Sequence, residues 1–413
     1  MNKIALVFPG QGSQYVGMGK KIYDEFSFVR ETFEEANDVL KFDLKKLCFE
    51  GDMTELTKTQ NTQPALLTMS VAYFKIYMEE IGIKPHNTAG HSLGEISALC
   101  CAGAVEFADA LQIVRQRGIF MQEAVPYGVG RMAAVSGIEL DIIEDVCAEI
   151  STLNNIVVVS NYNSPNQIVI SGHSEAVDEA CDKLSALGGK IHPLNVSAPF
   201  HSPLMRPAAD KLREELTKYS FKDLKWPVMS NVTAKPYAGK HEIVDMLTKQ
   251  IVQPVKWKSI IEFFTKQEID TVVEIGPRTV LRNLMKSNAP SIRAFAYDDA
   301  SDRAVLKKAA DKDSERNDRI DNGLLFIKMC LAAAVTTKNQ NWNEEEYQRD
   351  VVKPYRKIAA IKEEIEQSGR QPTLEELKEV YDALNGILQA KKLSKEEQNK
   401  RLSDILTRTG VNF

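Results

Sequence analysis

The feature of this sequence that most constrains its fold is the pentapeptide Gly90-His91-Ser92-Leu93-Gly94, a G-x-S-x-G pattern. The turn-forming Asn87 precedes it, and the residues that follow, 95–99, favour a helix. This is the strand-turn-helix context in which such a motif holds its serine exposed on a sharp turn. The helix dipole would favour an oxyanion beside Ser92. The pattern predicts an α/β fold with Ser92 as candidate nucleophile; the alternative is a glycine-rich turn with an incidental serine.

A serine hydroxyl needs a neighbouring base before it can act as a nucleophile, and the chain offers six histidines. His91 adjoins the serine, but successive side chains at the end of a strand diverge, which makes His91 a poor base. His201 lies between Pro199 and Pro203, which would restrict its backbone. We therefore take His201 as the candidate base. The alternative is a histidine that serves only the turn.

Arg117 lies in an amphipathic helix predicted from about Glu106 to Ala124. Its neighbours three and four residues away are all apolar: Ile113, Val114, Phe120 and Met121. A guanidinium on such an inward-facing stripe needs an anionic partner, because an isolated buried charge is costly. Two interpretations remain open, an internal salt bridge or a fork that grips a substrate carboxylate with two hydrogen bonds.

Four glycines, at positions 10, 12, 17 and 19, follow a predicted buried strand at Lys3–Phe8. Their spacing does not fit a nucleotide-binding loop: G-x-G-x-x-G would need a glycine at Tyr15, and the P-loop pattern would need one at Gln14. The alternative is a loop whose backbone N–H groups point at an oxyanion.

The chain divides by pattern into four stretches. Residues 129–196 interrupt the larger α/β region, 1–128 and 197–300, with a β-α-β-β-α-β order typical of a ferredoxin-like unit. We expect a turn over 162–166 within this insertion, and the last clear strand of the larger α/β region at Thr271–Ile275. Residues 301–413 are dense in charge and predict a helical extension, with capping boxes at Thr373-x-x-Glu376 and Ser394-x-x-Glu397.

Composition excludes several classes of function. The formal net charge of -5 gives no global field that favours nucleic acid or a membrane. The start of the chain lacks the features of a signal peptide, and the longest apolar run, near 324–335, is too short to span a bilayer. The six cysteines show no C-x-x-C spacing, which indicates reduced thiols in a cytoplasmic protein without a zinc site.

Several of these motifs together resemble a known family. Phe8–Gln14, Gly90–Glu95, Arg117, Ala198–Ser202 and Gln250 occur in the order seen in malonyl-CoA:acyl carrier protein transacylases. The likeness covers about residues 1–300. It implies an α/β-hydrolase-like large subdomain with an inserted ferredoxin-like small subdomain, to which this chain adds its C-terminal helical extension.

The resemblance also implies roles for individual residues. Ser92 would be the nucleophile and His201 the general base and acid, oriented by Gln250. The backbone N–H groups of Gln11 and Leu93 would form the oxyanion hole. The substrate side would be served by Arg117, which binds the malonyl carboxylate, by Asn161, which lines the site, and by Phe200, which is typical of malonyl-type rather than methylmalonyl-type enzymes.

The implied reaction is malonyl transfer from malonyl-CoA to the phosphopantetheine thiol of an acyl carrier protein, with no metal or redox cofactor. Residues 94–99 and the His201 segment look most like free-standing acyltransferases that serve modular polyketide synthases, so we favour polyketide over fatty-acid biosynthesis. An acyl-enzyme hydrolase and a non-catalytic scaffold are the competing hypotheses. For the extension alone, docking and plain packing against the core are equally open.

Overall fold

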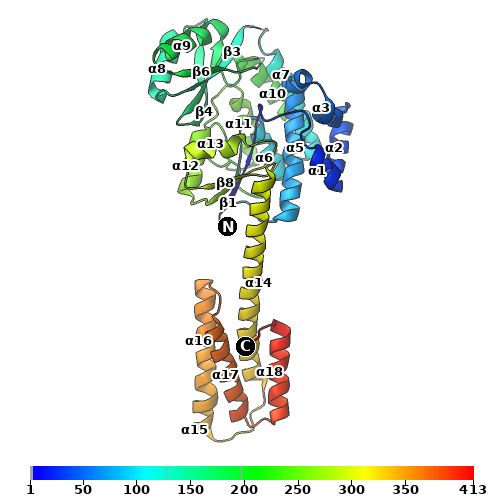
Figure 1. Cartoon of the computed structure of the whole chain (residues 1–413), viewed down its shortest axis with the longest axis vertical. Coiled ribbons are helices and arrows are strands. Elements are labelled where there is room, and N and C mark those ends of the chain that lie inside the picture. The colour runs from blue at the N-terminus through cyan, green and yellow to red at the C-terminus, as the bar shows by residue number, and fades with distance from the viewer. Residues whose placement is uncertain (1–2, 127, 197) are drawn as a thin grey trace. The chain divides into compact units, whose positions relative to one another are not determined.

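The computed structural model describes residues 3–126, 128–196 and 198–413, and only the backbone over 311–321. The chain forms two compact units, Met1–Lys308 and Ala309–Phe413 (Figure 1). No helix in these ranges is long and apolar enough to cross a membrane.

A parallel four-stranded sheet organises the first unit, with the order β2-β1-β7-β8. Its strands are β1 (Ile4–Phe8), β2 (Asn87–Gly90), β7 (Thr271–Glu274) and β8 (Arg293–Ala296). Every residue of β1 is fully buried, as expected for a central parallel strand covered on both faces. Phe8 is the register partner of Gly90, so the loops after β1 and β2 leave the sheet side by side.

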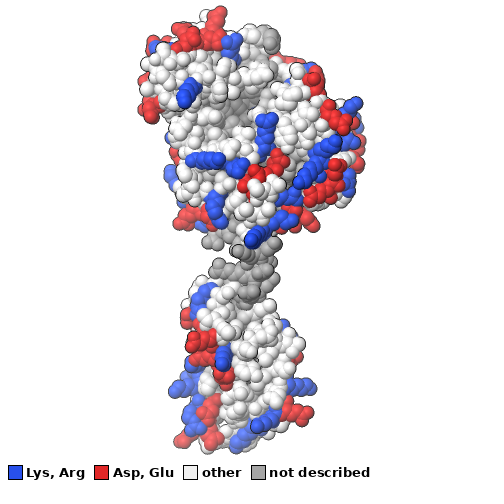
Figure 2. All heavy atoms as spheres, viewed as in Figure 1, with Lys and Arg blue, Asp and Glu red and all other residues white. Residues whose placement is uncertain are grey.

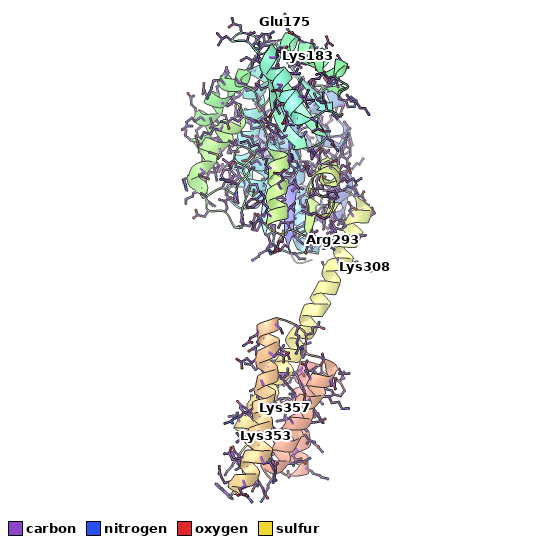
Figure 3. All side chains as sticks on the ribbon, turned by 90° about the vertical axis from the view of Figure 1, so that its left-hand side faces the viewer. Glu175, Lys183, Arg293, Lys308, Lys353 and Lys357 are labelled. Atoms are coloured by element: carbon purple, nitrogen blue, oxygen red, sulfur yellow. The ribbon has the colours of Figure 1, made fainter. Side chains whose placement is uncertain are left out.

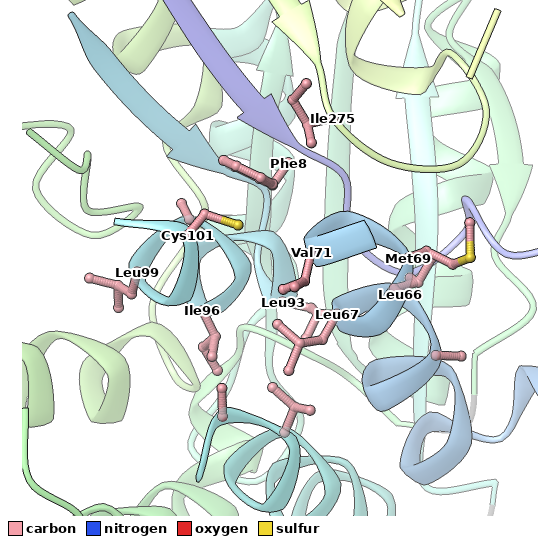
Figure 4. Close-up of a cluster of buried hydrophobic side chains, with 14 of the residues drawn as sticks. Phe8, Leu66, Leu67, Met69, Val71, Leu93, Ile96, Leu99, Cys101 and Ile275 are labelled. Carbon is pink, nitrogen blue, oxygen red and sulfur yellow. The ribbon is translucent and has the colours of Figure 1, made fainter. Parts of the chain in front are cut away.

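Helices cover this sheet. They are α1 (Lys20–Glu25), α2 (Ser27–Leu40), α3 (Leu44–Glu50), α4 (Met53–Thr57), α5 (Thr59–Glu80), α6 (Leu93–Cys101), α7 (Phe107–Glu123), α10 (Arg206–Leu216), α11 (Ile243–Gln250), α12 (Trp257–Lys266) and α13 (Val280–Asn288). Figure 4 shows apolar side chains of α5 and α6 meeting near Phe8 and Ile275, where they belong to one buried cluster. The helix predicted around Arg117 is confirmed as α7.

Two predictions in the first unit were incomplete. In the sequence, apolar residues at helical spacing over 66–80 predict a helix there, but α5 begins at Thr59 and contains Pro64. Almost every residue from 61 to 73 is buried, so packing on all sides offsets the hydrogen bond that Pro64 removes. Thr271–Ile275 is not the last strand: β8 follows it as a short, partly exposed edge strand that begins with a charged Arg293.

A second, antiparallel sheet interrupts the first, with the order β4-β5-β3-β6. Its elements are β3 (Gly130–Ser136), α8 (Leu140–Ile150), β4 (Val157–Ser164), β5 (Gln167–His173), α9 (Ser174–Ala186) and β6 (Lys190–Pro193), in the predicted β-α-β-β-α-β order. Helices α8 and α9 lie beside the strands of this sheet (Figure 1). They share a buried apolar cluster with β3, β4 and β5.

The turn expected over 162–166 was placed too early. β4 continues to Ser164 through two register irregularities, which leaves only Pro165 and Asn166 between the strands. The reason is a second set of partners: the N–H of Tyr162 donates to the carbonyl of Val255, and the N–H of Val255 donates to Ser160, both at 2.9 Å. These bonds tie β4 to the segment before α12.

The second unit is helical. α14 (Ala300–Thr336) leads into it, followed by α15 (Glu344–Tyr347), a π-helical turn at Gln348–Val352, α16 (Lys353–Ser368), α17 (Leu374–Ala390) and α18 (Lys395–Thr409). It has an apolar cluster of its own, to which α17 contributes Leu377, Val380, Leu384, Ile387 and Leu388. The predicted capping box of Thr373 and Glu376 is complete, while Ser394 accepts from the N–H of Glu397.

Charges of both signs cover this unit. Blue and red side chains are mixed along its visible face in Figure 2. Lys353 and Lys357 lie one turn apart on α16 (Figure 3), and Lys357 pairs with Glu379 of α17. The exposed surface therefore carries no single-sign patch on this face.

Candidate active site

A strained turn between β2 and α6 presents the side chain of Ser92. Its φ of 53° and ψ of -106° place Ser92 outside the ordinary helical and extended regions. The turn is so tight that a Cβ on Gly90 would lie 1.8 Å from the backbone of Gly94, and a Cβ on Gly94 would lie 2.0 Å from the carbonyl oxygen of Phe8. Both glycines of the motif are therefore required by backbone contact.

His201 faces this serine. Its Nε2 lies 2.8 Å from the Oγ of Ser92, and its Nδ1 lies 2.7 Å from the carbonyl oxygen of Gln250. Because a carbonyl only accepts, Nδ1 carries the proton and Nε2 is left as an acceptor for the serine hydroxyl. Burial, and after it the charge of Arg117, lowers the pKa of His201 to about 3, so the ring is neutral at neutral pH.

Arg117 is 1% exposed and reaches the same serine from α7. Its Nη2 donates to Ser92 Oγ at 3.1 Å and to Gln250 Oε1 at 2.8 Å, while Nε has no acceptor among the described residues. Burial lowers the pKa of Arg117 to about 10, with the charge of Glu95 opposing the shift, so the guanidinium stays charged. A buried cation with an unused donor beside the nucleophile can receive an anionic ligand.

The backbone N–H groups of Gln11 and Leu93 were predicted to form an oxyanion hole. Leu93 is the first residue of α6, and Gln11 lies in the loop after β1; both line the same cavity as Ser92. Among the described residues, neither N–H donates to a protein acceptor. The pairing of Phe8 with Gly90 brings these two loops together.

A cavity of about 500 Å³ opens over these groups. Asn161 and Phe200 line it. The inserted antiparallel sheet and the helices α5, α7 and α13 supply further lining side chains, among them Met132, Ala134, Asn163, Val169, Gln63, Met121, Val280 and Leu284. Gln250 is fully buried and is not among its lining residues. Its carbonyl contacts His201 and its side chain lies behind Ser92 and Arg117.

A second layer of polar groups was missed at the sequence level. Asn231 accepts from the N–H of Ser92 and donates to the carbonyl of Gly90, both at 2.7 Å. Glu95, fully buried in α6, accepts from Tyr237, Gln250 and the N–H of Asn231. The position of Glu95 directly after the motif, as the charged residue of a buried helix, was an available signal; Asn231 and Tyr237 offered none.

His91 is not placed to act as a base on Ser92. Its Nε2 lies 2.8 Å from the amide oxygen of Asn163, on the inserted sheet, and its ring packs against Trp257. Burial lowers the pKa of His91.

Residues 5–316 match the acyl transferase domain. The chain belongs to the acyl transferase domain family. It is 42% identical over 399 residues to a malonyl CoA-acyl carrier protein transacylase of Bacillus subtilis, a match that covers 96% of this chain and 99% of that acyl transferase. It is 45% identical over 306 residues to the protein of that name from Escherichia coli K12, covering 74% of this chain and 99% of the relative.

Solved structures agree. A malonyl-transacylase in complex with a type II PKS acyl-carrier protein superposes with a TM-score of 0.72 at 42% identity, over 74% of this chain and 99% of that one. The acyl transferase from Xanthomonas oryzae, a malonyl-CoA:acyl carrier protein transacylase, gives 0.73 at 40% identity, over 75% and 98%. The resemblance to this family is therefore confirmed. These matches leave about a quarter of the chain uncovered, whereas the Bacillus subtilis match extends over nearly all of it.

Proposed function

We propose that this chain transfers malonyl from malonyl-CoA to the phosphopantetheine thiol of an acyl carrier protein, through an ester on Ser92. One observation carries the proposal: the Oγ of Ser92 lies within hydrogen-bond distance of both His201 Nε2 and the buried cation of Arg117. A nucleophile, its base and a receptor for a carboxylate thus converge at one atom. Malonyl CoA-acyl carrier protein transacylases are the family relatives that support this substrate.

The first half-reaction acylates the enzyme. His201 Nε2 takes the hydroxyl proton as Ser92 Oγ attacks the thioester carbon of malonyl-CoA. The N–H groups of Gln11 and Leu93 are the donors that stabilise the tetrahedral oxyanion. The C–S bond then breaks, the imidazolium returns its proton to the departing sulfur, and CoA leaves with a thiol.

The second half-reaction runs the same steps in reverse. The thiol of the carrier's phosphopantetheine arm gives its proton to His201 and attacks the malonyl ester. The bond between the malonyl carbonyl carbon and Ser92 Oγ then breaks, and His201 returns the proton to Oγ, which regenerates the serine hydroxyl. Both steps use only the side chains and N–H groups named here, so the proposal needs no metal or redox cofactor.

Arg117 distinguishes malonyl from simple acyl groups. Two of its N–H directions can bind the terminal carboxylate as a fork, in the cavity that Arg117 lines. Phe200 and Asn161 line the space that the acyl chain would occupy. An acyl-enzyme hydrolase has no use for a buried cation at this place, so the hydrolase alternative is not favoured.

The finer architecture belongs to the same proposal. We assign residues 1–128 and 197–300 to a hydrolase-like large subdomain, 129–196 to a ferredoxin-like small subdomain, and 301–413 to an extension that docks or packs.

Polyketide rather than fatty-acid biosynthesis, with a modular synthase as partner, remains our preferred setting. Measuring kcat/KM toward purified carrier proteins from the two pathways would discriminate them. A cytoplasmic location stays a prediction.

The covalent intermediate tests the proposal. Incubation with malonyl-CoA should add one malonyl mass to the peptide that contains Ser92, and Ser92→Ala should abolish both the adduct and the transfer. Ser97→Ala is the matched control, because Ser97 is a buried serine of the same helix whose hydroxyl has no partner among the described residues. An adduct elsewhere, or undiminished transfer by Ser92→Ala, would overturn the assignment.

A further inference from the structure

Glu95 is a buried carboxylate that the transfer mechanism above does not use. It is 0% exposed, one turn into α6 from Ser92. Its Oε2 accepts from Gln250 Nε2 at 2.6 Å and from the N–H of Asn231 at 3.0 Å, and its Oε1 accepts from the hydroxyl of Tyr237. Burying a carboxylate costs desolvation free energy even when three donors bind it. A buried carboxylate so close to the nucleophile therefore needs an explanation.

The side-chain amide of Gln250 connects Glu95 to the acyl site. A carboxylate only accepts, so it fixes the NH₂ end of the amide toward Glu95. Arg117 only donates, so it fixes the oxygen end: Nη2 donates to Oε1 at 2.8 Å. The two neighbours therefore demand the same orientation of the Gln250 amide, and each holds it for the other.

This arrangement fixes the orientation of the Arg117 side chain. With Nη2 committed to Gln250 and Ser92, the guanidinium has a fixed place beside the nucleophile, in the wall of the cavity that a ligand would enter. The carboxylate of Glu95 also supplies the opposite charge in this buried network, and its charge raises the pKa of Arg117 against the effect of burial.

We propose that Glu95 is a positioning residue for carboxylate selection: it locks the amide of Gln250, which in turn holds the guanidinium of Arg117 in place for the malonyl carboxylate. This inference rests on the proposed function. Glu95 does not touch substrate, so its effect is transmitted through two other side chains.

The test is the ratio of kcat/KM for malonyl-CoA to that for acetyl-CoA, measured for Glu95→Gln with a carrier protein as acceptor. The assay is run at pH 8, above the pKa of about 7 to which burial raises Glu95. A glutamine at this position can turn either end toward Gln250, so the amide loses its charged acceptor and is held only by Arg117 and the carbonyl of Ser92 among the contacts described here. We expect the ratio to fall about tenfold, equivalent to about 1.4 kcal/mol.

Glu274→Gln is the matched control. Glu274 is also 0% exposed, and burial likewise raises its pKa to about 7, but it caps α13 through the N–H groups of Leu281 and Arg282. Loss of that carboxylate should lower Tm and leave the malonyl-to-acetyl ratio within about twofold of the wild-type value, within the usual scatter of independent sites.

A double-mutant cycle tests the route. If Glu95 acts through Gln250, then Glu95→Gln made in a Gln250→Ala background should change the ratio by less than about twofold. An equal fall in both backgrounds would show that Glu95 acts by another path and would overturn the proposal. So would an unchanged ratio in the single variant.

If Glu95→Gln does not fold, Tyr237→Phe replaces it, since it deletes one donor to Oε1 and keeps Glu95, Gln250 and Arg117. The ratio should then fall by about two- to threefold, a part of the full effect; no fall would refute the role. The two proposals fail in different ways. If the role of Glu95 is wrong, the variants still transfer malonyl through Ser92 but their malonyl-to-acetyl ratio does not fall as expected. If the proposed function is wrong, Ser92→Ala still transfers malonyl.

Discussion

Nδ1 of His201 donates to the backbone carbonyl of Gln250 over 2.7 Å, so a neutral group orients the base of this site. In serine-histidine-aspartate triads a carboxylate occupies that place and stabilises the imidazolium. Here burial and the nearby charge of Arg117 oppose protonation instead, and the pKa of His201 falls to about 3. The base is therefore ready to accept a proton far below the ordinary pKa of histidine.

The first prediction is an acid-tolerant acylation step. Protonation of His201 at Nε2 removes the acceptor for the serine proton. The acylation rate should therefore be lost only as the pH falls through the lowered pKa of His201. Single-turnover acylation of Ser92 should change by less than about threefold between pH 8 and pH 5 on account of this residue. A tenfold loss in the acylation rate for each pH unit below 6.5 would contradict this prediction. An inflection near pH 7 that disappears in Glu95→Gln would belong to Glu95.

The second prediction concerns Arg117. Charge-assisted hydrogen bonds contribute about 1.5–3 kcal/mol each, so Arg117→Ala should lower kcat/KM for malonyl-CoA by roughly two to three decades. Acetyl transfer should fall far less, since acetyl has no carboxylate to hold. Arg117→Lys should restore only part of the loss, because a point charge cannot form the fork. An unchanged malonyl-to-acetyl ratio in Arg117→Ala would make the arginine purely structural.

Residues that carry a local signature could be predicted from the sequence. The flanking glycines identified Ser92, and the flanking prolines identified His201. Arg117 was identified because it lies on an apolar helical face, where an unpaired charge is costly. The structure brings all three within one shell around the serine oxygen. The salt-bridge interpretation of Arg117 finds no direct carboxylate partner among the described residues; its side chain bonds Ser92 and Gln250 instead.

Residues brought in only by the tertiary fold could not be predicted. Asn231 lies in an irregular segment with no periodicity, yet it binds the N–H of Ser92 from 139 residues away. β8 gave too weak a pattern, because an edge strand of four residues is half exposed and needs no continuous apolar run. The hydrogen bonds between β4 and Val255 could not be predicted for a different reason: they join backbone groups, which place no requirement on the choice of side chain.

The third prediction tests the backbone crowding at the elbow. Gly94→Ala would place a Cβ 2.0 Å from a backbone oxygen that cannot move without shifting β1. We expect a loss of about 3 kcal/mol or more in the free energy of unfolding, or no folded protein. Gly386→Ala is the control: Gly386 lies exposed in α17 with open space around it, and alanine there should stabilise that helix by about 0.5–1 kcal/mol. Chemical denaturation of both variants checks the contrast.

The last prediction concerns where the first unit can be cut. Its compact core includes the start of α14: Leu306 is 1% exposed within the main apolar cluster. Arg303 binds Glu80 through Nε at 2.6 Å and Nη2 at 2.5 Å, and this pairing helps to lower the pKa of Glu80 to about 2. A chain that ends at residue 300 lacks both groups and leaves Glu80 without its arginine, although the hydroxyl of Tyr297 still donates to Glu80.

A chain that ends at Lys308 should therefore fold and transfer malonyl to a free carrier protein, whereas one that ends at residue 300 should be markedly less stable. Burial of a leucine contributes about 1.5–3 kcal/mol, and the loss of Arg303 adds to it. Leu306→Ala and Arg303→Ala in the full chain should each reproduce part of the loss in Tm. If the 308-residue chain transfers to free carrier but not within a synthase, the extension is a docking element. If that chain is insoluble while the full chain is not, the extension serves mainly to cover apolar surface.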